Sequence, residues 1–165
     1  IAVRVSSPGP AFYHQRRVGK DGRTFMIHKF RSMRPDAEAH TGVVWARAGD
    51  PRVTPVGRFL RRTRLDELPQ LWNVLIGDMS LVGPRAEREQ LVVQYQKEIP
   101  FYRARLLVKP ALTGWAQINY GYVVDVKETA IKLEYDLYYI IHRSLTMDLS
   151  IILRTIGTVL GRKGR

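Results

Sequence analysis

Residues 64–85 constrain the fold and the chemistry of this chain more than any other segment. Two adjacent carboxylates, Asp66 and Glu67, precede apolar residues at helical spacing, and Gly77-Asp78 follows the last of them. Acidic residues are favoured at the start of a helix, and glycine is favoured just past its end. The pattern therefore predicts an amphipathic helix from Asp66 to Gly77. Its apolar stripe consists of Leu68, Leu71, Trp72 and Leu75.

Basic residues accompany the two carboxylates. Four arginines lie within the nine residues before Asp66, and Arg85 follows a Gly-Pro pair. A carboxylate can attack phosphorus when nearby cations hold the phosphate, and a second carboxylate can bind Mg²⁺. The segment thus favours phosphoryl transfer, with Arg85 as a phosphate ligand. Two plainer interpretations stay open: the acids only begin a helix, and Arg85 is the surface residue of a turn.

The net charge narrows the class of partner. The chain carries 27 Lys and Arg against 15 Asp and Glu, a formal net charge of +12. Such a field attracts nucleic acid, anionic lipid or phosphorylated substrates, although a solvated cationic surface is the plainer explanation. The sequence has no cysteine, which excludes disulfides, thiolate zinc sites and a cysteine nucleophile. Its four histidines show no metal-ligand spacing.

The length of 165 residues suits one domain, and we expect 1–165 to be a single catalytic unit. No apolar run reaches the roughly 18 residues that a spanning helix needs. The sequence begins at Ile1 without an initiator methionine. We therefore expect a fragment whose missing N-terminus carries a membrane segment.

The remaining pattern predicts an α+β fold that is mostly helical. The tetrapeptide 19–22 separates two strand-like segments, 11–18 and 23–33, and indicates a β-hairpin near the N-terminus. Thr54-Pro55 is an N-cap followed by proline, which predicts a helix over 55–64. Further helices are expected over 35–40, 86–98, 100–106, 126–142 and 145–160, and loops over 41–51 and 109–115.

Other charged residues are candidates for the same chemistry. Lys29 and Arg31 flank Phe30 at the end of the hairpin, where they either bind phosphate or nucleic acid or protect an edge strand, the edge strand being the plainer interpretation. Asp136 lies inside an apolar helix, where an unpaired acid is costly, so we expect it to pair with an arginine or a metal. Asp148 is most simply the N-cap of the last helix.

Two predicted helices carry surfaces suited to a membrane. The helix over 55–64 has a basic face and an apolar face. Phe59 and Trp72 can lie at the level of lipid headgroups, with the tyrosines of 135–139 as further anchors. The usual alternative is that the apolar stripes face the protein's own core. Sequence alone leaves both interpretations open.

Four motifs carry a family resemblance, and they follow one another as the segments 29–33, 64–85, 109–119 and 135–139. In this order they resemble the bacterial sugar transferase family, the monotopic polyprenyl-phosphate phosphoglycosyl transferases. The likeness extends from about Gly9 to Leu160. The residues after Asn119 resemble the exopolysaccharide branch of the family.

The resemblance implies an activity. Members transfer a sugar 1-phosphate from a UDP-sugar to polyprenyl (undecaprenyl) phosphate at the cytoplasmic face of the bacterial inner membrane, releasing UMP and starting the assembly of exopolysaccharide or related glycans. It implies Mg²⁺ as cofactor, and UDP-sugar, polyprenyl phosphate and a membrane lipid surface as partners, with a homo-oligomer left open. It also implies a membrane-associated, monotopic protein whose N-terminal re-entrant helix is missing from this sequence.

Matching positions carry the residue roles that the resemblance implies. Asp66 matches the nucleophile, which forms a covalent aspartyl phosphosugar, and Glu67 matches the acid associated with Mg²⁺. Arg85 matches an arginine that binds phosphate, and Arg61 matches a basic residue ahead of the acids. The supporting acids and the remaining phosphate-binding candidates are Asp136, Asp148, Lys29 and Arg31.

Two other classes of protein compete with this interpretation. A nucleic-acid-binding domain would explain the charge, but the sequence lacks a recognition helix, a zinc module and an aromatic RNP-type strand, so nucleic acid is not an expected partner. A non-catalytic peripheral membrane domain would need only basic and aromatic residues. The pair of acids at positions 66 and 67 favours the enzyme over both.

Overall fold

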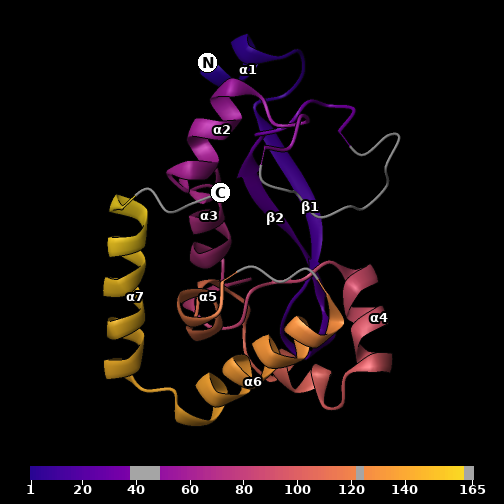
Figure 1. The fold of residues 1–165 in the computed structure, drawn as a ribbon, viewed down its shortest axis with the longest axis vertical. Coiled ribbons are helices and arrows are strands. Elements are labelled where there is room, and N and C mark those ends of the chain that lie inside the picture. The colour runs from indigo at the N-terminus through magenta and orange to yellow at the C-terminus, as the bar shows by residue number, and fades with distance from the viewer. Residues whose placement is uncertain (38–48, 122–124, 162–165) are drawn as a thin grey trace.

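The computed structural model describes residues 1–37, 49–121 and 125–161 (Figure 1). Helices dominate this part of the chain and a hairpin lies near its N-terminus, which confirms the predicted α+β class. In the same ranges, no helix combines the length and the apolar character needed to cross a membrane. The short helix α1 (Ala2–Ser6) lies beside α2 (Pro55–Arg62) at one end of the molecule.

The predicted hairpin consists of β1 (Phe12–Val18) and β2 (Thr24–Phe30), which pair antiparallel. The short 3-10 turn η1 (Lys20–Gly22) joins them. Asp21 and Gly22 have positive φ values there, a region that glycine and short polar residues tolerate best. The second strand ends at Phe30, three residues earlier than expected, because only the segment up to that point pairs with β1.

The structure contains a second, parallel pair of strands, one of which lies in the expected loop over 109–115. β3 (Ser80–Val82) pairs with β4 (Ala111–Thr113), and both are too short for alternation to reveal them. Gly83 follows β3 with a φ of 153°, and a Cβ there would lie 3.1 Å from the Lys109 carbonyl oxygen. A Cβ at Gly114 would lie 2.0 Å from the Gly83 oxygen. The two glycines therefore let the 83–85 corner lie directly against β4.

The predicted helix starting at Asp66 is wrong in its first turn. Arg64 adopts a φ of 58° after α2, the 3-10 turn η2 (Leu65–Glu67) follows, and α3 (Gln70–Leu75) begins after Pro69. Proline has no N–H to donate to the carbonyl four residues back, so the first α-helical bond over this turn is missing. The Leu65 carbonyl accepts instead from the Leu68 N–H, at 3.2 Å.

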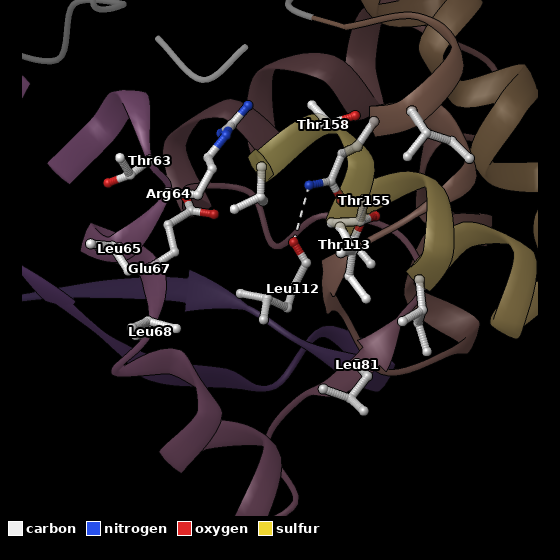
Figure 2. Close-up of a pocket in the computed structure, with 15 residues that line it drawn as sticks. Thr63, Arg64, Leu65, Glu67, Leu68, Leu81, Leu112, Thr113, Thr155 and Thr158 are labelled. Carbon is white, nitrogen blue, oxygen red and sulfur yellow. Dashed lines mark hydrogen bonds between the residues drawn. The ribbon is translucent and has the colours of Figure 1, made fainter. Parts of the chain in front are cut away.

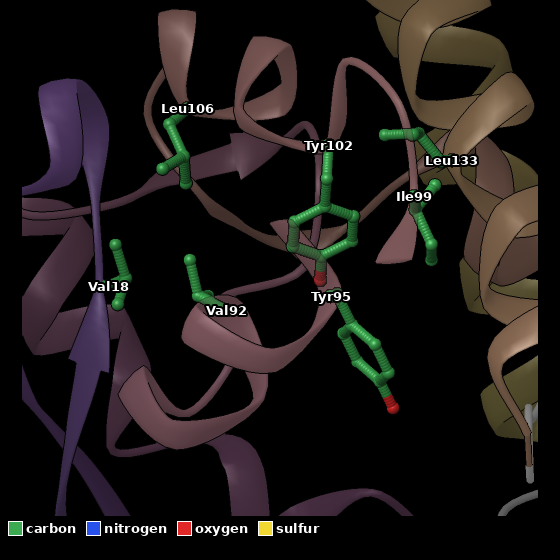
Figure 3. Close-up of a cluster of buried hydrophobic side chains, with 7 residues drawn as sticks. All are labelled: Val18, Val92, Tyr95, Ile99, Tyr102, Leu106 and Leu133. Atoms are coloured by element: carbon green, nitrogen blue, oxygen red, sulfur yellow. The ribbon is translucent and has the colours of Figure 1, made fainter. Parts of the chain in front are cut away.

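The main apolar core lies between β1, α4 (Glu89–Glu98), η3 (Tyr102–Leu107) and α6 (Val126–His142) (Figure 3). The structure confirms helices within 86–98 and over 126–142, whereas the one expected over 100–106 is the 3-10 segment η3. The buried side chains of this cluster are Val18, Val92, Tyr95, Ile99, Tyr102, Leu106 and Leu133.

Two further helices, α5 (Trp115–Asn119) and α7 (Leu145–Leu160), complete the described fold, and α7 packs against α5, β3 and β4. Asp148 is not the N-cap of α7, because Ser144 Oγ accepts from the Met147 N–H at 3.2 Å. Of the helix expected over 35–40, residues 35–37 form a turn. Residues 38–40, and 41–48 of the expected loop, lie outside the described residues.

The apolar stripe of α3 faces away from the core. α3 buries Gln70 and Asn73, whereas Trp72 is 57% exposed and Leu75 is 76% exposed. Asn73 Nδ2 donates to the Met26 carbonyl at 2.8 Å, and Asn73 Oδ1 accepts from the His28 N–H at 3.2 Å. The core-facing interpretation of this stripe is therefore wrong. Together with Phe59 of α2 it forms an α2–α3 apolar face of Phe59, Leu68, Leu71, Trp72 and Leu75.

Candidate functional site

The turn η2 places the two predicted acids in a buried position. Asp66 is 7% exposed and Glu67 is 8% exposed. Arg64 precedes them in the left-handed conformation, which turns the chain inward at the end of α2. Neither acid caps a helix through its side chain, so the helix-start interpretation does not account for them. A buried carboxylate needs a cationic or hydrogen-bonding partner.

Glu67 has two such partners from distant parts of the sequence. Lys29, on β2, places its Nζ 2.7 Å from Glu67 Oε1. Arg85, from the corner after β3, places its Nη2 2.5 Å from the same oxygen and its Nη1 3.4 Å from Oε2. Burial opposes ionisation of Glu67, but Arg85 and Lys29 outweigh it and hold the pKa of Glu67 well below its usual range. The site therefore contains a fixed carboxylate flanked by two cations.

Asp66 differs from Glu67 although it is adjacent. Its Oδ1 is buried and has no hydrogen-bond partner within the described chain. Burial and the neighbouring charge of Glu67 raise the pKa of Asp66, while Lys29, Arg61 and Arg85 act in the opposite direction. A carboxylate oxygen without a strong partner keeps its lone pairs available, which is the property of a nucleophile or metal ligand.

The predicted phosphate-binding residues divide into three that surround the acids and one that does not. Lys29 and Arg85 contact Glu67, and Arg61 acts on Asp66 through its charge while its Nε donates to Ser32 Oγ at 2.9 Å. Arg31 is buried elsewhere. It donates to the carbonyls of Pro10 at 2.6 Å and Ser7 at 2.9 Å, so its guanidinium fastens the N-terminal segment to β2.

Asp136 pairs with an arginine, as expected. Arg105 Nε and Nη2 lie 3.0 Å and 2.8 Å from Asp136 Oδ2, and both side chains are buried. The same Nη2 donates to the backbone carbonyl of Arg85 at 2.9 Å. Asp136 therefore acts on the candidate site indirectly, because it orients Arg105 and Arg105 holds the backbone at Arg85.

Sequence reasoning missed Arg105, Glu87 and Lys132, which continue this buried charge network. Lys132 Nζ lies 2.9 Å from Glu87 Oε1, and Arg105 Nη1 lies 4.0 Å from it. Burial opposes ionisation of Glu87, but Lys132, Arg105 and Arg17 outweigh it and lower the pKa of Glu87 to about 2. The segment 102–107 contains two arginines, of which Arg103 is exposed and Arg105 is buried, so no local signal distinguished Arg105.

Asp148 lies behind the corner rather than among the cations of the site. Its Oδ1 accepts from the Tyr139 hydroxyl at 2.8 Å, and the same hydroxyl lies 3.3 Å from the carbonyl oxygen of Val82. Burial, followed by the contact with Asp148, raises the pKa of Tyr139. The pair thus supports the end of β3, immediately before Gly83.

The acid pair also offers a place for a divalent cation. Mg²⁺ in phosphate enzymes is bound by one or two carboxylates together with substrate oxygens and water. Glu67 Oε2 accepts a long hydrogen bond of 3.4 Å from Arg85 Nη1, and Asp66 Oδ1 has no partner within the described residues. Among those residues, no group of three or more His, Cys, Asp or Glu is arranged to hold a metal. The residues therefore fit a cation that a bound phosphate helps to hold.

Comparison with known proteins agrees with the motifs. The model of the bacterial sugar transferase family matches residues 1–162. The chain is 50% identical over 160 residues to the UDP-N-acetylgalactosamine-undecaprenyl-phosphate N-acetylgalactosaminephosphotransferase of Aeromonas hydrophila, covering 97% of this chain and 38% of that protein.

Two more relatives point to the same family. The UDP-glucose:undecaprenyl-phosphate glucose-1-phosphate transferase of Xanthomonas campestris pv. campestris is 47% identical over 165 residues, covering 99% of this chain and 34% of that protein. The exopolysaccharide production protein PSS of Rhizobium leguminosarum bv. phaseoli is 38% identical over 167 residues, covering 98% of this chain and 84% of that protein. The chain spans about a third of the length of the first two relatives.

Proposed function

The chain belongs to the bacterial sugar transferase family, and we propose that it transfers a sugar 1-phosphate from a UDP-sugar to undecaprenyl phosphate, initiating exopolysaccharide or related glycan assembly. One observation carries the proposal. A buried Asp66 with an unpartnered oxygen lies beside Glu67, which fixes Lys29 and Arg85 next to it. This arrangement combines a nucleophile with the cations that a diphosphate requires.

The reaction proceeds in two displacements at one phosphorus atom. An Asp66 carboxylate oxygen attacks the β-phosphorus of the UDP-sugar, the bond from that phosphorus to the bridging oxygen breaks, and UMP leaves with the electron pair. A phosphate oxygen of the lipid then attacks the same phosphorus, and the Asp66 carboxylate is the leaving group. Splitting the transfer in this way lets a water-soluble donor and a lipid acceptor use one site in turn.

Four charged residues of the site position and neutralise the reacting groups. Lys29, Arg61 and Arg85 favour the charged form of Asp66 and so oppose burial and Glu67, which raise the pKa of this carboxyl. Lys29 and Arg85 also neutralise charge on the donor's phosphates. Glu67 holds both cations in place, and with the substrate phosphates it would bind Mg²⁺, which supplies further neutralisation of phosphate oxygens.

The membrane surface is the second part of the proposal. We place the α2–α3 apolar face in the headgroup region at the cytoplasmic side of the bacterial inner membrane, since both substrates and the acid pair must meet there. Phe59 is 58% exposed, and the aromatic and aliphatic side chains of this face are typical of interfacial helices. Basic residues of α2, including Arg58 and Arg62, would contact anionic headgroups.

Intact-mass spectrometry of the full-length protein with a UDP-sugar and Mg²⁺, without lipid, tests the chemistry. We expect a mass gain equal to one sugar phosphate, UMP in solution, loss of both in Asp66→Asn, and loss on addition of EDTA with recovery on excess Mg²⁺. Glu134→Gln, an exposed acid on α6, is the matched control and should form the adduct normally. An unchanged adduct in Asp66→Asn would remove Asp66 as the nucleophile.

A further inference from the structure

An apolar groove opens beside the acid pair (Figure 2). It has a volume of about 280 Å³ and lies between η2 with its flanking residues, the β3–β4 pair and α7. Glu67 forms one part of its wall, next to the site described above. Its aliphatic lining consists of Leu65, Leu68, Leu81, Leu112, Ile118, Ile152, Ile156 and Val159.

Polar side chains in the groove are largely hydrogen-bonded to the protein itself. Gln117 Nε2 donates to the Leu112 carbonyl at 3.1 Å, the contact drawn as a dashed line in Figure 2. Thr113 Oγ1 and Thr155 Oγ1 lie 2.7 Å apart, and Thr158 Oγ1 donates to the Arg154 carbonyl at 3.0 Å. Gln117 Oε1 is buried without a partner, but a single acceptor is too little to recognise a nucleobase. The lining therefore suits a hydrocarbon better than a uridine or a sugar.

The contrast between the charged end of the groove and its mainly aliphatic remainder defines the shape of its occupant. Glu67 in the wall is bound by Lys29 and Arg85, so one end meets cations that suit a phosphate. Arg64 lines the groove beside Glu67, and the remaining walls are mainly aliphatic, with threonines among them, up to Ile156 and Val159 on α7. An occupant that matches the cations at one end and the aliphatic walls elsewhere has an anionic head and a branched or linear hydrocarbon tail.

We propose that this groove binds the first isoprene units of the acceptor lipid, with the lipid phosphate at the Lys29–Arg85 end. The inference rests on the proposed function, because only a lipid phosphate acceptor brings such a tail to Asp66. Leu68 belongs both to the groove and to the α2–α3 apolar face, so the groove is continuous with the surface placed at the membrane.

Narrowing the groove tests the inference without disturbing the core. Ile156 lines the groove but is 49% exposed, so Ile156→Trp adds volume there with little cost to folding. Leu153, on the same helix, is 70% exposed and is not part of the lining, which makes Leu153→Trp the matched control. We expect Ile156→Trp to raise the KM for undecaprenyl phosphate at least about tenfold, since one isoprene unit is displaced from apolar surroundings.

Two further readouts in the full-length protein separate the alternatives. The mass gain on Asp66 from the UDP-sugar alone should be as fast in Ile156→Trp as in the wild type, and transfer to the tail-less acceptor butyl phosphate should be equal in both. A slower adduct in Ile156→Trp would assign the groove to the donor and overturn the inference. Unchanged KM for undecaprenyl phosphate would overturn it too. If the wild type forms no adduct at all, the proposed function fails first, and the inference fails with it.

Discussion

Two regions of this molecule use apolar side chains in opposite ways. Around α4, η3 and α6, residues such as Tyr102 and Leu133 are buried with a network of paired charges beside them. On α3 the order is reversed, because Asn73 is fully buried while Leu75 is exposed. Helical periodicity identifies the apolar side of a helix in both regions, but it does not say what that side contacts. In α3 the polar side contacts the protein and the apolar side is left for another partner.

Removing the buried acid of the first region should have the largest effect. Glu87→Ala leaves Lys132, Arg105 and Arg17 without their shared carboxylate, and we expect a loss of about 3–5 kcal/mol in the free energy of unfolding. Urea denaturation followed by circular dichroism measures it. Glu134→Ala, an exposed acid on α6, should change stability by less than about 0.5 kcal/mol.

The difference in unfolding free energy between the wild type and Glu87→Ala should depend on pH in a definite direction. The pKa of Glu87 is lowered to about 2 from 4.5, so its contribution is present above the unfolded-state value and disappears as the pH falls through the folded-state value. The gap between wild type and Glu87→Ala should therefore narrow from pH 4.5 towards pH 2. A gap that stays constant over this range would contradict the network.

A cavity in the main apolar core should lower the free energy of unfolding slightly less than Glu87→Ala does. Leu133→Ala removes a buried side chain of α6, and we expect a loss of about 2–5 kcal/mol in unfolding free energy. Leu75→Ala makes the same chemical change on the α2–α3 apolar face, where the side chain is exposed, and should cost below about 0.5 kcal/mol. Equal losses in the two variants would show that Leu75 is covered by the protein's own chain.

Making α3 uniformly apolar should destabilise the fold rather than improve it. Asn73→Leu leaves the Met26 carbonyl and the His28 N–H without their partner, which costs about 1–3 kcal/mol per buried group. Because His28 is adjacent to Lys29, the adduct assay should also show slower phosphosugar formation in this variant. A rise in melting temperature in Asn73→Leu would refute the inverted polarity of α3.

The smallest expected effect concerns the membrane. Trp72→Ser or Leu75→Ser in the full-length protein should weaken partition into vesicles containing anionic lipid by about 1 kcal/mol, roughly fivefold, because part of the buried apolar area is lost. Sedimentation of the protein with vesicles measures the partition, and the melting temperature should stay unchanged. Ile131→Ser, an exposed apolar residue on α6, is the control.

Several residues of the candidate site could be predicted from local sequence, but the contacts between them could not. The acids at 66 and 67 and the Gly-Pro-Arg corner were identified because each motif is contiguous, and the need of Asp136 for an arginine followed from the cost of a buried charge. Arg105, Glu87 and Lys132 were missed since their partners lie far away in sequence. Sequence left phosphate binding open for Arg31, because it could not show that the guanidinium donates to the carbonyls of Ser7 and Pro10.

Sequence by itself determined the hairpin, most helices, the cationic character and the residues that match the family motifs. These features depend on propensity, periodicity and contiguous motifs, which act over a few neighbouring residues. Only the tertiary structure decided that Glu67 holds Lys29 and Arg85, that Asp66 keeps an unpartnered oxygen, and that α3 turns its apolar side outward. Those outcomes depend on burial and on charges brought together from distant positions, and no local pattern records either.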